Sequence, residues 1–230
     1  KIHRQGNLGF FLWLISLPLM ASVSQSPGTP GALAALGQPP ENAEGVRQLC
    51  VAGAAVYYGV GSFKDDRGHY EEVEVKFPGC PEPEGIPQCS TAMSHKNVLR
   101  GMHCSPYAKI VLCVSGAMWD TIVDLRPESP TFLKWDAVLL SSERRTRLYV
   151  PSGCGHGYLS MQDQTVSLYY KFGMYESSKE VGVHPFDPEV GIKWPSPLDG
   201  GSYIISEKDG GAISAREGAA RRAAFSKSRL

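Results

Sequence analysis

Four separated polar residues lie within a run of short β-type segments in this sequence, and their types suit one kind of proton chemistry. They are His103, Lys109, Tyr169 and Asp209. Moving a proton beside a ketone needs a base, stabilisation of the enolate oxygen, and an acid that returns a proton on the opposite face. A histidine, a fixed cation, a phenol and a carboxylate together can supply these functions.

The segments that must position these residues have the pattern of β-strands. Short apolar and aromatic runs alternate with clusters of Gly, Pro, Asp and Ser, at 73–77, 109–114, 118–125, 132–140, 147–150 and 165–172. The tripeptide 115–117, Ser-Gly-Ala, predicts a tight hairpin between two of them. No helical period of useful length precedes the C-terminal tail, where 212–222 has weak helical character. Many short strands with close turns predict an all-β sandwich or barrel, of which the jelly-roll cupin is one form.

The bulk composition is that of one globular domain with extensions. The 230 residues divide into a signal-like or non-native segment at 1–24, a flexible linker at 25–48, a folded domain at 49–210 and a polar tail at 211–230. Lys+Arg and Asp+Glu are both 23. This balance indicates no broad surface for nucleic acid or membrane, and it still permits a local basic pocket for a phosphorylated substrate.

The N-terminal segment resembles a targeting signal. Basic residues Lys1, His3 and Arg4 precede an apolar run at 8–21, and small residues end the segment at 21–24. The run is shorter than the ~20 residues that span a bilayer, and Pro18 disfavours a stable transmembrane helix. Upstream sequence that is not native is the alternative, since the chain does not begin with Met. We therefore expect a secretory or organelle-targeted protein if the segment is native, and a cytoplasmic protein if it is not.

The cysteines are too dilute for a disulfide framework, and they form no Cys-x-x-Cys pair that would favour a structural zinc site. Free cysteine is often buried, so we expect packing to be their main role. They are Cys50, Cys80, Cys89, Cys104, Cys113 and Cys154.

Several blocks of the sequence resemble the dTDP-4-dehydrorhamnose 3,5-epimerase family of cupin-fold sugar-nucleotide isomerases. The blocks are 98–103 (Val-Leu-Arg-Gly-Met-His), 124–132 (Asp-Leu-Arg-Pro-Glu-Ser-Pro-Thr-Phe), 151–158 (Pro-Ser-Gly-Cys-Gly-His-Gly-Tyr) and 206–209 (Ser-Glu-Lys-Asp). The resemblance extends from about Val56 to Asp209. It implies a jelly-roll cupin barrel with a short irregular or helical C-terminal tail. It also implies an isomerase that inverts C3 and C5, or C3 alone, of a dTDP-4-keto-6-deoxyhexose in deoxysugar biosynthesis of the dTDP-rhamnose type.

The resemblance assigns a role to each of the four polar residues. His103 matches the family's base, and Asp209 matches the carboxylate that bonds the far ring nitrogen and fixes its tautomer. Lys109 falls where a lysine faces the developing enolate at C4, and Tyr169 matches the general acid. Adjacent Tyr170 would point to the opposite face because side chains alternate along a strand. From the residues alone, His103 could equally be a hydrogen-bonded core histidine, and Lys109 an ordinary strand-end charge.

The resemblance also implies a set of substrate contacts. Arg100 would bind the diphosphate, for which a guanidinium fork is suited, and His156 would help to position the substrate. Arg67 and Glu72, in the segment 65–72, would reach the site of a neighbouring subunit in a homodimer. The remaining matched positions are Gln88, Ser90 and Tyr175, and an exposed turn aromatic is the alternative for Tyr175.

The sequence departs from the family pattern mainly on the nucleotide side. Ser90 replaces the usual Asn, Met93 replaces a common Arg, and Cys104-Ser105 replaces the usual Tyr-Gln after the catalytic histidine. These changes put the nucleotide identity or affinity in question and leave the base and acid in place.

A metal is the obvious alternative for a cupin. Metal-binding cupins show a His-x-His pair with a later carboxylate and histidine. Here His103 is followed by Cys104-Ser105, and His156 is isolated. The sequence therefore predicts no metal and no other cofactor.

Two other functions remain open on the sequence. One is a sugar-nucleotide 3,4-ketoisomerase on the same fold, which the presence of Lys109 and the 206–209 block disfavours. The other is a non-catalytic cupin that binds carbohydrate or nucleotide, which would make the presence of both His103 and Tyr169 accidental.

Overall fold

A computed structural model describes residues 45–59, 62–66, 68–71, 88–144, 146–197 and 199–227. The signal-like segment 1–24, most of the linker 25–48 and the strand predicted at 73–77 lie outside the described residues. Within them, no helix is long and apolar enough to cross a membrane.

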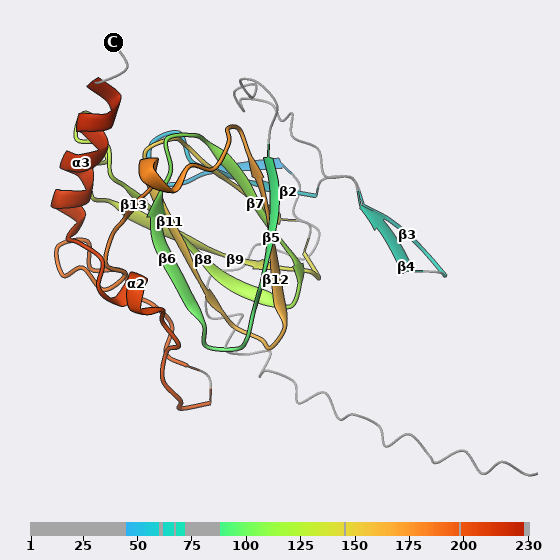
Figure 1. The fold of residues 1–230 in the computed structure, drawn as a ribbon. Helices are drawn as coiled ribbons and strands as arrows, with labels where there is room; N and C mark the ends of the chain where they lie inside the picture. The colour runs from blue at the N-terminus through green and yellow to red at the C-terminus, as the bar shows by residue number, and fades with distance from the viewer. Residues whose placement is uncertain are drawn as a thin grey trace, which may run out of the picture.

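Two antiparallel sheets form the body of the protein (Figure 1). The six-stranded sheet has the order β1 (Gly45–Gln48), β2 (Ala55–Tyr58), β10 (Thr146–Val150), β7 (Lys109–Ser115), β12 (Thr165–Lys171), β5 (Gln88–Ser94). The five-stranded sheet has the order β13 (Val181–Gly182), β6 (Leu99–Cys104), β11 (Cys154–Ser160), β8 (Ala117–Asp124), β9 (Trp135–Ser141). This arrangement confirms the predicted all-β architecture.

Three short elements and one longer helix complete the described chain. A two-stranded ribbon of β3 (Ser62–Asp65) and β4 (Gly68–Glu71) lies apart from the barrel, at the right of Figure 1. The 3₁₀ turn η1 (Ser177–Lys179) precedes β13, and α2 (Glu207–Gly210) and α3 (Ala215–Lys227) end the chain. Both α-helices lie outside the five-stranded sheet, near β6 and β13.

The hairpin predicted at Ser115-Gly116-Ala117 is wrong, although the turn itself is present. β7 and β8, which flank it, belong to different sheets, so the chain crosses the barrel at this point instead of pairing with itself. Gly116 has a φ of +75°, and a Cβ there would lie 2.6 Å from Oγ1 of Thr165. A glycine is therefore needed for the crossing, and the local turn signal could not say which sheet the next strand would join.

The main core lies between the two sheets and follows the two-residue period of the strands. Val56, Val111 and Leu148 from one sheet are buried against Ile122 and Leu140 from the other. Burial of each such side chain contributes about 1.5–3 kcal/mol. Since alternate residues point outward, the opposite face of each strand is free for other packing.

The C-terminal helix α3 packs against a second apolar cluster on the outer side of the five-stranded sheet. Ala215 and Ala219 are buried there with Val183. A Cβ on Gly218 would lie 2.4 Å from Cγ2 of Val183, so the helix approaches the sheet closely. The stretch predicted as a polar tail at 211–230 thus contributes, as far as it is described, to the folded body.

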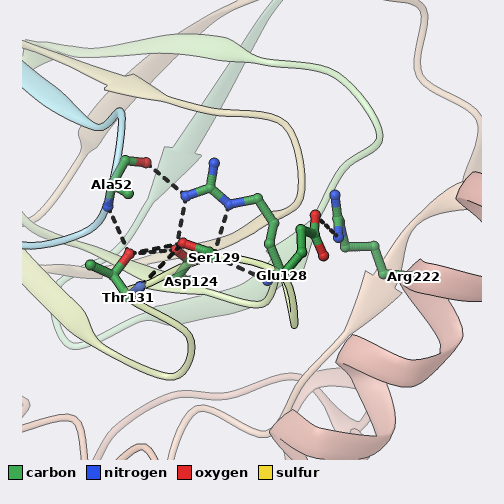
Figure 2. Close-up of polar contacts among 7 residues, drawn as sticks. Ala52, Asp124, Glu128, Ser129, Thr131 and Arg222 are labelled. Carbon is green, nitrogen blue, oxygen red and sulfur yellow. Dashed lines mark hydrogen bonds and ion pairs between the residues drawn. The ribbon is translucent and has the colours of Figure 1, made fainter.

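A buried carboxylate fastens one end of the barrel. Asp124, at the end of β8, accepts hydrogen bonds from Arg126, Ser129 and Thr131, and the last of these also accepts the N–H of Ala52 between β1 and β2 (Figure 2). Burial by itself would raise the pKa of Asp124, but these donors lower it to about 2. The 124–132 block is therefore a brace between the sheets.

The described cysteines are all free. Cys104, Cys113 and Cys154 are buried, as expected, and burial raises the pKa of each thiol to about 12. Cys50 and Cys89 are exposed, so packing does not account for them.

Candidate active site

A pocket of about 400 Å³ opens between the two sheets, lined by residues of β5, β6, β7, β11, β12 and α2 and of the loops beyond the strands. Most of the residues singled out in the sequence lie on its wall. They are Ser90, Arg100, His103, Lys109, His156, Tyr169 and Tyr175. The strands thus bring together side chains that are up to 85 positions apart, from Ser90 to Tyr175.

His103 on β6 is held by a carboxylate from α2. Its Nε2 lies 2.8 Å from Oδ1 of Asp209, whose Oδ2 accepts the backbone N–H of Gly101 at 3.1 Å. Burial opposes the ionised form of Asp209, but the bonds from His103 and Gly101 lower its pKa. Because an ionised carboxylate only accepts hydrogen bonds, Nε2 carries the hydrogen and Nδ1 is left to take a proton.

A local cap places Asp209 behind the histidine. Ser206 precedes α2, and its hydroxyl accepts the N–H of Asp209 at 3.1 Å. This is the usual N-cap interaction, in which a side-chain oxygen satisfies a backbone N–H of the first turn. The 206–209 block therefore has a structural reason for its serine as well as its aspartate.

Two glycines allow β6 and β11 to approach closely beside the pocket. Gly101 has a φ of +118°, and a Cβ there would lie 2.6 Å from Cα of Gly157. A Cβ on Gly157 would lie 2.6 Å from the carbonyl oxygen of Arg100. Any larger residue would push the two strands, and the histidines they carry, apart.

Lys109 is the first residue of β7 and is buried, with 5% of its surface exposed. Burial lowers the pKa of its ammonium, and the negative charges of Glu180 and Asp120 oppose that shift. Its Nζ lies 6.0 Å from the centroid of the Tyr169 ring. A cation in this dry position can stabilise a developing oxyanion far better than one in water.

Tyr169 on β12 faces the pocket from the sheet opposite His103. Burial raises the pKa of its phenol well above the ordinary value, so the hydroxyl stays protonated and can act as a donor. Tyr170 points the other way and packs against Phe172, with ring centroids 6.0 Å apart. This placement agrees with the expected alternation and selects Tyr169 over Tyr170.

His156 on β11 lies directly opposite His103 in the ladder between β11 and β6. Its Nε2 is 2.5 Å from Oδ1 of Asp120, and both side chains are buried. Burial lowers the pKa of His156, while the charge of Asp120 opposes the shift. The rings of His156 and Tyr169 are nearly perpendicular, with centroids 5.9 Å apart, so the buried pair also packs beside the phenol.

The nucleotide-side residues fall into three groups. Arg100 and Ser90 line the pocket. Gln88 lies outside the pocket wall, and its side-chain oxygen accepts the N–H of Tyr175 at 3.1 Å. Arg67 and Glu72 lie outside the described residues.

Several pocket residues were not predicted from the sequence. Glu180 accepts a hydrogen bond from Ser105 at 2.9 Å, and Lys171 lies opposite Lys109 between β12 and β7. Lys208 also lines the pocket, next to Asp209. Asp120, the partner of His156, could have been suspected, because a lone carboxylate in the apolar run 118–123 must be paired if the strand is buried. For Glu180, Lys171 and Lys208, no comparable feature of the sequence indicated a place in the pocket.

The pocket bears more positive than negative side chains. Arg100, Lys109, Lys171 and Lys208 line it together with one carboxylate among its lining residues, Glu180. This excess suits a substrate with a phosphate or diphosphate group. Among the described residues, no three of His, Cys, Asp and Glu gather closely enough to hold a metal ion.

Comparison with known proteins places this geometry in a family. The sequence profile of the family described as dTDP-4-dehydrorhamnose 3,5-epimerase matches residues 51–217. The dTDP-4-dehydrorhamnose 3,5-epimerase of Streptomyces griseus is 39% identical over 156 residues, which are 64% of this chain and 76% of that protein.

Solved structures show the same fold and include enzymes with nucleotide sugars bound. NovW, a 4-keto-6-deoxy sugar epimerase of Streptomyces spheroides, has a TM-score of 0.68 and 31% identity, covering 82% of this chain and 96% of that chain. ChmJ, a 3'-monoepimerase of Streptomyces bikiniensis in complex with dTDP-quinovose, has a TM-score of 0.66 and 30% identity, covering 78% and 91%. Since the family profile matches most of the sequence and solved members share the fold, this chain belongs to the dTDP-4-dehydrorhamnose 3,5-epimerase family.

Proposed function

We propose that this protein epimerises C3 and C5, or C3 alone, of a dTDP-4-keto-6-deoxyhexose, in deoxysugar biosynthesis of the dTDP-rhamnose type. The observation that carries the proposal is the placement of His103 and Tyr169. They enter one pocket from opposite sheets, with the Lys109 ammonium beside the phenol. A base and an acid on two sides of one pocket are what inversion at a carbon requires.

In the proposed reaction, Nδ1 of His103 takes the proton from the carbon beside the ketone. The electrons of the broken C–H bond move toward the C4 oxygen, where the Lys109 ammonium stabilises the enolate. The hydroxyl of Tyr169 then gives its proton to the opposite face of the same carbon. Solvent returns a proton to the phenolate, and the imidazolium of His103 releases its proton to solvent, so that both groups are restored. Asp209 stabilises the imidazolium while it exists, and the steps use neither metal nor cofactor.

The nucleotide half of the substrate would occupy the cationic part of the pocket. Arg100 is assigned to the diphosphate, with Ser90 on the wall beside it. His156, fixed by Asp120, would help to position the sugar. Tyr175 lines the pocket, and its backbone N–H is held by the side-chain oxygen of Gln88.

The proposal includes a homodimer. The ribbon of β3 and β4 lies apart from the barrel and carries exposed Asp65 and Asp66, which supports the proposed contact with a second subunit (Figure 1). Arg67 and Glu72 would then complete the neighbour's site. Light scattering on the purified protein measures the mass. Monomeric protein with full activity would overturn this part.

The experiment that tests the function uses protein from about Val46 onward with dTDP-4-keto-6-deoxyglucose in deuterated buffer, observed by NMR. We expect deuterium at C3 and C5, or at C3 alone for a single-site epimerase. A 3-keto product would instead identify a ketoisomerase. No deuterium at either carbon would refute the epimerase and leave a binding protein as the alternative.

A further inference from the structure

A pair of buried hydroxyl groups joins the two sheets at the wall of the pocket. Oγ of Ser94, at the end of β5, lies 2.8 Å from the hydroxyl of Tyr158 on β11. The two residues are 2% and 1% exposed, and Tyr158 lines the pocket. Neither residue has a part in the proton transfer. A buried hydroxyl must nevertheless be hydrogen-bonded, and its partners indicate which group it supports.

The partner is the guanidinium of Arg100. Its Nε donates to Oγ of Ser94 at 2.9 Å, and its Nη2 donates to the carbonyl oxygen of Met93 at 3.2 Å. Arg100 is itself opposite Tyr158 in the ladder of β6 and β11. Three strands, β5, β6 and β11, thus converge on one exposed arginine side chain.

The direction of these bonds follows from the chemistry of the groups. A guanidinium can only donate, so Oγ of Ser94 accepts from Arg100 and shares one further hydrogen with Tyr158. Ser167 also approaches the Tyr158 hydroxyl, at 3.4 Å, which helps to hold it in place. Arg100 keeps Nη1 and one hydrogen of Nη2 for another ligand, and these can form the fork that suits phosphate oxygens.

We propose that Tyr158 and Ser94 are positioning residues that hold the Arg100 guanidinium for the diphosphate of the substrate. The inference rests on the function proposed above. A long arginine side chain loses much rotational freedom on binding, and prior fixation by Ser94 removes part of that loss. The diphosphate takes no part in the proton transfer, and the proposal treats its binding as equal in the ground and transition states. The pair therefore acts on KM and leaves kcat unchanged.

The test is Tyr158→Phe, which removes the hydroxyl and keeps the ring. We expect the affinity for dTDP, measured by calorimetry, to fall about tenfold, as loss of support for one charged hydrogen bond implies. KM should rise by a similar factor at constant kcat. Tyr170→Phe is the matched control, since that ring packs away from the pocket, and its kinetics should match wild type. A fall in kcat with unchanged dTDP affinity would overturn the inference.

A second variant separates positioning from general damage. Ser94→Ala should reproduce the effect, and Ser94→Thr, which keeps a hydroxyl, should restore much of the affinity. In an Arg100→Ala background, Tyr158→Phe should have no further effect on dTDP affinity, because the group that it positions is gone. Full additivity would refute the linkage.

Wild-type behaviour distinguishes the two proposals. Wild-type protein that turns over the keto sugar while Tyr158→Phe binds dTDP normally would refute only the positioning role. Wild-type protein that neither binds dTDP nor exchanges deuterium would refute both.

Discussion

His103 and His156 lie directly opposite each other on neighbouring antiparallel strands, and each is held by its own carboxylate. The His103 side chain is 33% exposed, whereas His156 is 3% exposed and paired with a fully buried Asp120. Burial lowers the pKa of His156, which favours its neutral form. One fold thus places two histidines side by side in different environments, one accessible to substrate and one fixed in the wall.

The His103–Asp209 pair should be essential for turnover. His103→Ala or Asp209→Asn should lower kcat by roughly 100- to 10,000-fold, the usual contribution of a general base, with the fold intact by circular dichroism. Asp199→Asn is the matched control, since Asp199 is an exposed aspartate bonded to Asn97. Near-normal activity in either pair variant would remove the pair from the mechanism.

Loss of the phenol should separate the two halves of the reaction. In Tyr169→Phe, His103 can still remove the proton, so exchange of substrate hydrogen with deuterated solvent should persist while inversion slows. NMR of the recovered substrate and product measures both rates. Tyr170→Phe should behave as wild type, and if it shows the split instead, the acid is Tyr170 and the assignment is off by one residue.

Short-range patterns predicted the strands β7, β8, β9, β10 and β12, and the resemblance to the family predicted most of the pocket positions. Alternation along 165–172 predicted that only one of Tyr169 and Tyr170 enters the pocket, and the resemblance to the family selected Tyr169. The same resemblance paired His103 with Asp209, which are separated by 106 residues. The order of the strands in the two sheets was harder to predict from the sequence. At Gly116 a turn was visible, but whether the next strand pairs or crosses is decided by packing of both sheets.

Contacts between side chains that are far apart in the sequence were not predictable either, because they depend on the whole fold. Asp120 is the one carboxylate in the apolar run 118–123, and only the fold brings it to His156. Ser105 and Glu180 are 75 residues apart and meet at the pocket without a shared motif. Gln88 was assigned to the nucleotide, yet its side chain holds the backbone of Tyr175, a contact that depends on the path of a loop.

Activity should fall at alkaline pH because of Lys109. Burial lowers the pKa of the Lys109 ammonium, so its charge is lost as pH rises through that lowered value. Burial raises the pKa of Tyr169, so the acid is still protonated there. The groups that act on the ammonium are Glu180, Asp120, Cys104, Lys171 and His156. The fall of kcat at alkaline pH therefore follows the loss of the proton from the Lys109 ammonium.

Glu180→Gln tests this assignment. Removal of the carboxylate takes away the largest opposing charge on Lys109, so the pKa of the lysine falls further and the alkaline limb moves to lower pH. Glu176→Gln is the control, because Glu176 is exposed and paired with Lys179. A limb that stays in place in Glu180→Gln would assign the alkaline ionisation to another group.

The brace at Asp124 should make the protein sensitive to acid. The folded-state pKa of about 2 lies below the ordinary value of 3.8, so the ionised carboxylate stabilises the fold above about pH 4. That contribution is lost as pH falls toward 2. Asp124→Asn should lower the free energy of unfolding at pH 7 by about 3–5 kcal/mol, because Arg126 is left without its buried partner.

Urea unfolding followed by fluorescence at pH 7 and at a series of acid pH values measures both effects. Below pH 4 the stability of Asp124→Asn should change less steeply with pH than that of wild type, since the titrating group is absent. Asp163→Asn is the control, an exposed aspartate paired with His95, and surface changes of this kind stay within about 0.5 kcal/mol. If Asp124→Asn were no less stable than that control, the hydrogen bonds around Asp124 would not hold the two sheets together, and the end of the barrel would depend on apolar packing alone.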